Sequence, residues 1–217
     1  WDMHGDLIVR TGIIMTPYFP LRNILRGMQI CFTNDRLAID TLKVVSGKST
    51  IEAKGELTGL RRALAGSGRN RSGRSALNLD IDIRTDRMDA NEILTAYKAG
   101  SEFNPEAAKD KMAEATNAEF LQMVISDTAA AGKDAGLLVI PGNINADISL
   151  SGKDITWSDL EISDLNASLL MKERCVQITN TSASTNMGDI SLDAFYSTRT
   201  KKDLKTGFSI SFKDITA

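Results

Sequence analysis

Histidine and cysteine are scarce in this chain of 217 residues, which contains one histidine, His4, and two cysteines, Cys31 and Cys175. Zinc sites and catalysis by a Ser-His or Cys-His pair need several such side chains close together. The inventory therefore nearly excludes both kinds of site, and it predicts neither a metal nor a cofactor. We expect a protein that is not an enzyme.

Long apolar runs and an excess of positive charge are also missing. No stretch reaches the roughly 18 apolar residues that a membrane-spanning helix needs, and no basic segment followed by an apolar run opens the chain. The formal net charge is −2 at pH 7, which disfavours a dedicated nucleic-acid binder. We interpret the chain as a soluble part of a longer protein whose membrane anchors would lie outside it.

The two cysteines leave two interpretations open. Each lies in a strand-like run, Gln29–Thr33 or Cys175–Thr179, in which polar and apolar residues alternate. One interpretation is that both are free thiols packed at a strand face. The other is a disulfide between them, which an oxidising compartment and suitable geometry would allow.

Most of the sequence has an apolar period of two residues, which is typical of strands with one face toward an apolar interior and one toward water. Examples are Met28 to Phe32, Leu77 to Ile83 and Phe208 to Phe212, with short polar turns between such runs. Strands joined by short turns run antiparallel. The pattern predicts a mainly β protein with a helical insertion, forming either a curved open sheet or a sandwich-like body.

An internal repeat organises these strands. An offset of 139 residues aligns Leu21–Glu52 with Leu160–Ser191 without a gap, and Leu77–Ile83 is matched to Gly207–Lys213. We predict two tandem antiparallel β-repeat units, residues 1–88 and 137–217, separated by a helical insertion at residues 89–136.

The insertion has a different composition, rich in Ala, Glu, Lys and Met. Asp89-Ala90-Asn91-Glu92 is a capping-box-like helix start, and Asn104 followed by Pro105 predicts a second one. The second helix would carry one apolar side, made of Ala108, Met112, Ala115, Phe120 and Met123. Three interpretations stay open for it: packing on the rim of the sheet, a mobile linker, and a helix that binds a partner.

Two further features were weighed as sites. The glycine-rich stretch Gly66–Gly73 precedes a strand-like run and not a helix, so it does not predict a phosphate-binding loop. Its arginines indicate a solvated loop, or else a contact with lipid phosphates or an acidic partner; they are Arg61, Arg62, Arg69, Arg71 and Arg74. A carboxylate-based hydrolase is the remaining enzymatic hypothesis, with candidates Asp80, Asp82, Asp147 and Asp189.

The second unit resembles a known family. It runs from Ile140-Pro141-Gly142-Asn143 through Leu160–Leu169 and Val176-Gln177-Ile178, then through Met187-Gly188-Asp189-Ile190 to Phe208–Ile215. This rhythm is similar to the carboxy-terminal β-repeat region of AsmA-like proteins, relatives of the TamB and YhdP group. The resemblance implies a non-catalytic module in the periplasm of a Gram-negative bacterium, within a protein anchored in the inner membrane.

The resemblance also implies a role in outer-membrane assembly or in phospholipid transfer along an apolar groove. Its partners would be phospholipid or lipid acyl chains, with envelope proteins as further candidates. The candidate lipid-binding side chains are Met28, Ile30, Phe32, Leu37, Ile39, Leu169, Met171, Val176, Ile178, Ile190, Phe208, Ile210 and Phe212. From the residues alone, the same side chains would equally form a closed core. An alternative function is an extracellular or periplasmic recognition module that binds protein or glycan.

Overall fold

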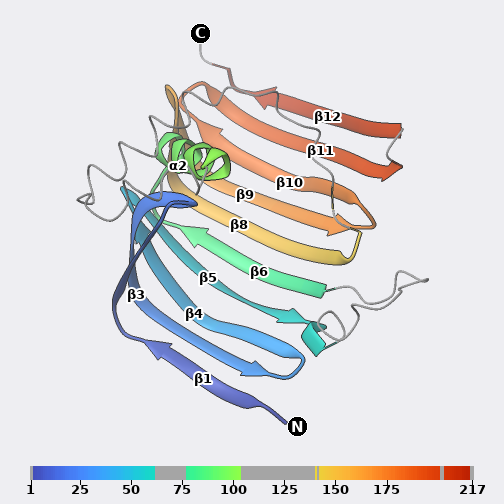
Figure 1. Ribbon diagram of the computed structural model, residues 1–217. Coiled ribbons are helices and arrows are strands. Elements are labelled where there is room, and N and C mark those ends of the chain that lie inside the picture. Colours follow the sequence, from blue (N-terminus) through green and yellow to red (C-terminus); the bar gives the residue numbers. More distant parts are fainter. Residues whose placement is uncertain (1, 62–76, 104–139, 141, 201–202, 216–217) are drawn as a thin grey trace.

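Within the residues that the structure describes, the protein is mainly β and consists of one open sheet of 12 strands with the helix α2 against it (Figure 1). The computed structural model describes residues 2–61, 77–103, 140, 142–200 and 203–215. The predicted fold class is confirmed. Of the two predicted forms, the structure adopts the open sheet and not the sandwich-like body.

The strands follow one another across the sheet in the order β1-β3-β4-β5-β6-β8-β9-β10-β11-β12, while β2 pairs with β3 and β7 with β8. Their bounds are β1 His4–Val9, β2 Gly12–Thr16, β3 Phe19–Thr33, β4 Arg36–Ser46, β5 Ser49–Thr58, β6 Leu77–Thr85, β7 Met88–Asp89, β8 Ile144–Trp157, β9 Leu160–Lys172, β10 Cys175–Thr185, β11 Gly188–Thr200 and β12 Asp203–Lys213. The helix α2 spans Ala90–Glu102.

The offset of 139 residues reappears in the strands themselves. It carries the end of β3 onto the end of β9, both ends of β4 onto those of β10, and the start of β5 onto that of β11. The irregularity repeats too: the β4–β5 register shifts between Ile39 and Leu42, and the β10–β11 register shifts between Ile178 and Thr181. The two segments therefore share one local architecture.

The register corrects one predicted match. Leu57 lies opposite Leu79 in the first unit, and the residue that corresponds to Leu57 in the second unit, Tyr196, lies opposite Thr206. Thr206 is thus the counterpart of Leu79, and the match of Leu77–Ile83 to Gly207–Lys213 is wrong by three residues. Alternation itself argues against this match, because a shift of three residues is odd and sets the apolar Leu79 and Ile81 against Ser209 and Ser211.

The repeat also includes the strand before β3. β1 and β2 pair with β3 in the same antiparallel register, so together they act as one interrupted strand. In the second unit β8 pairs with β9 in the same way. The shared register makes Leu7 the counterpart of Ile148. Each unit thus contains five successive positions in the sheet, and the two units meet where β6 and β8 pair in parallel.

The predicted helix start at Asp89 is confirmed by the geometry of α2. The side chain of Asp89 accepts a hydrogen bond from the backbone N–H of Glu92 at 3.1 Å, as an N-cap residue does. Glu92 does not return this bond to Asp89, because its carboxylate accepts from the backbone N–H of Lys48. The N–H of Asp89 donates instead to Oγ of Ser49. The first turn of the helix is therefore fastened to the β4–β5 turn.

Helix α2 lies against β3 and β8 near one end of the sheet (Figure 1). All three elements carry buried side chains. They include Leu21, Leu25, Ala96, Ala99 and Ile155. The rings of Tyr18 and Phe103 add an edge-to-face contact with centroids 5.6 Å apart. The most compact part of the described core is thus at this end.

Some predicted features lie outside the described residues. They are the second helix, with its apolar side from Ala108 to Met123, and the arginine-rich loop except for Arg61. The backbone N–H of Arg61, which is described, donates to Oδ1 of Asp35 at 3.0 Å. No helix in the described ranges has the length and apolar character needed to cross a bilayer.

Candidate functional site

An unbroken row of apolar residues and glycine crosses the whole sheet, with one residue from each strand except β2 and β7. Residues that lie opposite each other on neighbouring strands project their side chains on the same face. The row consists of Leu7, Ile30, Ile39, Gly55, Ile81, Ile148, Leu169, Ile178, Ala194 and Phe208. We call the face that carries this row the apolar face.

A second row runs beside the first and extends the same face. It consists of Gly5, Phe32, Leu37, Leu57, Leu79, Ala146, Met171, Val176, Tyr196 and Thr206. On the other side of the first row lie shorter rows, such as Met28–Leu42–Ala53–Ile83–Leu150 and Ala183–Ile190–Phe212. The apolar face therefore spans both repeat units without interruption.

All thirteen side chains predicted to contact lipid lie on this apolar face. None of them is fully buried: ten are half-buried, and three on the edge strand β12 are exposed. Phe208 is 76% exposed, Phe212 56% and Ile210 45%. These side chains are therefore not the interior of a closed core in the described part of the chain.

Sequence reasoning missed the centre of this face. Leu79, Ile81 and Ile83 of β6 and Ile148 and Leu150 of β8 join the two halves of the candidate set. Their alternation identified them as strand residues. The parallel pairing of β6 with β8 aligns the apolar residues of these two strands, and no local sequence pattern predicts this pairing.

The helix α2 covers one end of the apolar face. Leu25 belongs to this face because it lies opposite Val44, and it is buried on β3, a strand that α2 contacts. Gly100 of α2 lies so close to the backbone carbonyl of Tyr18 that a side chain at this position would collide with it. The helix thus closes the face at the start of β3 and leaves the central rows half-exposed.

The opposite face is polar and holds a groove of about 1210 Å³. One row across it reads Lys43, Glu52, Arg84, Ser151, Asn166, Ser182, Ser191 and Ser211. The residues that line the groove include six cationic and four anionic side chains and no aromatic one. This polar groove would suit a charged or hydrogen-bonding ligand and offers no stacking platform for a sugar.

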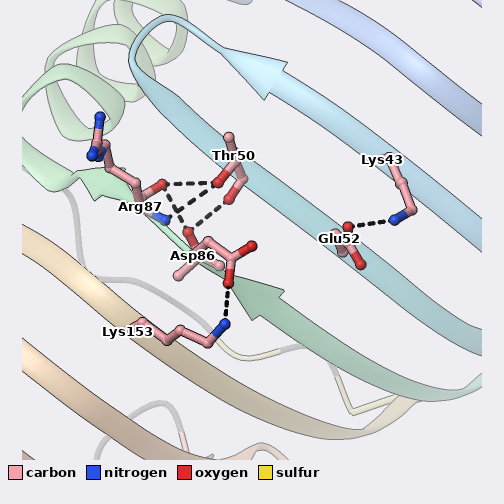
Figure 2. Close-up of polar contacts among 7 residues, drawn as sticks. Lys43, Thr50, Glu52, Asp86, Arg87 and Lys153 are labelled. Carbon is pink, nitrogen blue, oxygen red and sulfur yellow. Dashed lines mark hydrogen bonds and ion pairs between the residues drawn. The ribbon is translucent and has the colours of Figure 1, made fainter.

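Ion pairs bridge the strands on the floor of the polar groove (Figure 2). Lys43 Nζ lies 2.6 Å from Glu52 Oε1, and Lys153 Nζ lies 2.6 Å from Asp86 Oδ1. The Lys153 ammonium lowers the pKa of Asp86, and the Asp86 carboxylate raises the pKa of Lys153. Hydrogen bonding to Asp82 likewise raises the pKa of Arg84. Because these pairs are exposed, each contributes little to stability.

Thr50 and Arg87 lie next to these pairs (Figure 2). Together with Thr85 they form a hydrogen-bond cluster. The hydroxyl of Thr85 donates to the carbonyls of Thr50 and Arg87, and the N–H of Thr50 donates to the Arg87 carbonyl at 2.8 Å. Thr85 is buried. The cluster fixes the end of β6 against β5, where the chain leaves the sheet toward α2.

The two cysteines are free, and their positions rule out the disulfide interpretation within one chain. Cys31 lies on β3 and Cys175 on β10, six strand positions away. At about 4.8 Å between neighbouring strands this is roughly 29 Å, whereas a disulfide needs Cα atoms within about 7 Å. Side-chain hydrogen bonds to Asp6 and Asp40 raise the pKa of Cys31 to about 12, which makes its thiol unreactive at neutral pH.

The four candidate carboxylates do not form one site. Asp80 and Asp147 lie opposite each other on β6 and β8, both exposed on the polar face. Asp82 lines the polar groove and pairs with Arg84, whereas Asp189 lies opposite Lys213 on β12. Within the described residues no group of three or more His, Cys, Asp or Glu side chains could hold a metal ion.

Comparisons with known proteins found no relative. No family model matches the sequence, no curated protein matches it, and no solved structure matches its fold. The interpretation of this sheet therefore rests on its own residues and their geometry.

Proposed function

We propose that the chain is a non-catalytic periplasmic module of an AsmA-like envelope protein that contacts lipid acyl chains through its apolar face. The observation that carries this proposal is the row from Leu7 to Phe208, which crosses ten strands and whose members are half-buried or exposed. Soluble monomers rarely expose so extended an apolar surface without a binding role. Burying one methylene of an acyl chain contributes about 0.8 kcal/mol.

The shape of the surface supports an elongated apolar ligand. The rows run across the strands, so their length increases with each strand that joins the sheet. Ten strand positions at about 4.8 Å give a path of roughly 43 Å, longer than an extended acyl chain. The side chains are mostly aliphatic, with Met28, Met171 and three phenylalanines as adaptable contacts. Such a surface would hold chains of varied length without a specific polar contact.

Two neighbouring leucines on β9 provide a matched test. Leu169 lies on the apolar face opposite Ile148, and Leu170 lies on the polar face opposite Asp147. We expect Leu169→Asp to abolish binding of a fluorescent acyl probe and co-purification of phospholipid detected by native mass spectrometry. Leu170→Asp should leave both unchanged. Circular dichroism would show that both variants fold.

Two results would contradict lipid contact. One is a wild-type protein that neither binds the probe nor retains phospholipid. The other is equal loss of probe binding in both folded variants, because a charge on the polar face should not affect acyl chains. Ile178→Asp, in the same row on β10, provides a second variant if Leu169→Asp fails to fold.

The polar groove favours a second candidate function, a recognition module for a protein or another polar partner. It combines a volume of about 1210 Å³ with hydrogen-bonding side chains such as Asn166 and Asn180. The absence of aromatic lining side chains makes a glycan the less favoured partner. A pull-down that compares the wild type with Asn166→Ala tests this function. Saturable binding to the wild type that this substitution weakens would support it.

A further inference from the structure

In the part of the chain that the structure describes, each of the two outermost strands has a partner on one side only. Within the described residues β1 pairs with β3, and β12 pairs with β11. An unpaired strand edge presents N–H and C=O groups that can accept another strand. Such edges usually carry a charge on the buried face or a proline that prevents pairing. The apolar-face positions of β12 carry Thr206, Phe208, Ile210 and Phe212 and thus lack this protection.

The internal repeat shows what covers such an edge. β12 occupies the position in the second unit that β6 occupies in the first, and β1 with β2 occupies the position of β8. Inside the chain β6 and β8 pair in parallel over nine residue pairs, from Leu77 with Ile144 to Thr85 with Gly152. The unpaired edges of β12 and β1 therefore correspond to the edges of β6 and β8 that pair with each other inside the chain.

The strand directions allow the same pairing between two copies. Each step from β1 to β6 is antiparallel, the step from β6 to β8 is parallel, and each step from β8 to β12 is antiparallel. Counting these steps shows that β1 and β12 run in the same direction. A second sheet placed beside the first would thus bring its β1 parallel to β12, as β8 is to β6.

We propose that copies of this chain associate head to tail, with β1 of one copy adding in parallel to β12 of the next. The internal register, transferred to this edge, places Leu7 of one copy opposite Phe208 of the other, because Ile148 lies opposite Ile81. It also places Val9 opposite Ile210 and Gly5 opposite Thr206. The apolar rows then continue from one copy into the next. This inference goes beyond lipid contact and does not depend on it.

The side chains at this edge give the association its driving force. Phe208 is 76% exposed and Leu7 47% exposed, and pairing would bury both together with Val9 and Ile210. The contact uses different strands on the two copies. It therefore does not end at a two-fold dimer, and an open assembly of any size keeps one β1 and one β12 edge free. Association should increase with protein concentration beyond a dimer.

Single charged substitutions test the pairing. Sedimentation velocity of the 217-residue chain should show a mass that rises from low to high micromolar protein. Phe208→Lys and Leu7→Lys should each stay monomeric over that range, because a lysine on the apolar face blocks one of the two edges. The controls are Ser209→Lys and Ile8→Lys, the neighbouring residues on the opposite face, which should associate as the wild type does.

Mixing the two blocked variants distinguishes this arrangement from a symmetric dimer. Phe208→Lys retains a normal β1 and Leu7→Lys a normal β12, so an equimolar mixture should form a dimer and nothing larger. A wild type that stays monomeric at high micromolar concentration would overturn the proposal. So would a mixture without dimer, or association that only one of the two substitutions blocks, since pairing of β12 with β12 would not need Leu7.

Discussion

The carboxylate of Glu92 accepts a hydrogen bond from the backbone N–H of Lys48 at 2.8 Å, although the two residues are 44 positions apart. Glu92 lies in the first turn of α2, and Lys48 lies in the turn between β4 and β5. The same turn provides Ser49, whose hydroxyl accepts from Asp89. These hydrogen bonds hold the start of the helix to one end of the sheet. A local capping motif would have predicted them within the helix alone.

Removing this carboxylate should weaken the attachment of the helix. We expect Glu92→Ala to lower the free energy of unfolding by about 1–2 kcal/mol, because the N–H of Lys48 loses a charged acceptor. Urea denaturation followed by circular dichroism measures it. Thr95→Ala, at an exposed position of the same helix, is the control and should not lower stability. Equal stability of Glu92→Ala and wild type would show that the bond contributes nothing.

A second prediction concerns the contact of α2 with the chain before β3. Gly100→Ala should lower the free energy of unfolding by about 1–3 kcal/mol, because the added methyl group would collide with the carbonyl of Tyr18. Gly27→Ala on β3 is the matched control, since open space surrounds that position. Thermal or urea unfolding compares the two variants. If Gly100→Ala were as stable as Gly27→Ala, the helix could not lie this close to Tyr18.

The thiol of Cys31 provides a third prediction. Hydrogen bonds to Asp6 and Asp40 raise its pKa to about 12, so little thiolate is present at pH 8 and alkylation should be slow. Asp40→Asn, which replaces the charged acceptor 3.1 Å from the sulfur by a neutral amide, should lower this pKa and increase the alkylation rate about tenfold or more. Iodoacetamide labelling of a Cys175→Ser background, followed by mass spectrometry, isolates Cys31. Asp35→Asn serves as the control, and an unchanged rate in Asp40→Asn would refute the assignment.

The fourth prediction is a pH dependence in the polar groove. Lys153 lowers the pKa of Asp86, so their ion pair stabilises the fold above the ordinary carboxyl pKa and loses this effect as the pH falls through the lowered value. Lys153→Ala should raise the Asp86 pKa toward its ordinary range, whereas Lys153→Arg should keep it low. Carbon-detected NMR titration of the Asp86 carboxyl measures both, and high salt should reduce the difference.

Much of this fold could be predicted from the sequence because its strands alternate cleanly. The alternation of Met28, Ile30 and Phe32 with polar residues indicates an apolar strand face. Their counterparts Ala167, Leu169 and Met171 repeat the pattern. The offset of 139 residues then placed the turns and strand ends of both units. Asp89 with Glu92 announced the helix start by local chemistry. Each of these signals depends on residues a few positions apart.

What could not be predicted depends on contacts between distant segments. Nothing near Ile81 indicates that Ile148 lies beside it in parallel, so the centre of the apolar face was missed. The three-residue error in matching β6 to β12 has a different origin, because an odd shift sets Leu79 against Ser209 and the alternation of the sequence already argues against it. The choice between an open sheet and a sandwich likewise depends on curvature and edge pairing, which no single strand encodes.

Because β6 and β8 pair in parallel, the segment between them must bring the chain back to the end of the sheet at which β6 begins. β6 ends at Thr85 and β8 begins at Ile144, at opposite ends of the sheet, so the polypeptide must travel back along the strand direction before it can continue. Nine residues of extended strand cover about 30 Å, which sets the least distance that this return must span. A connection of a few residues would make β6 and β8 pair antiparallel as a hairpin, and every later strand would then run in the opposite direction.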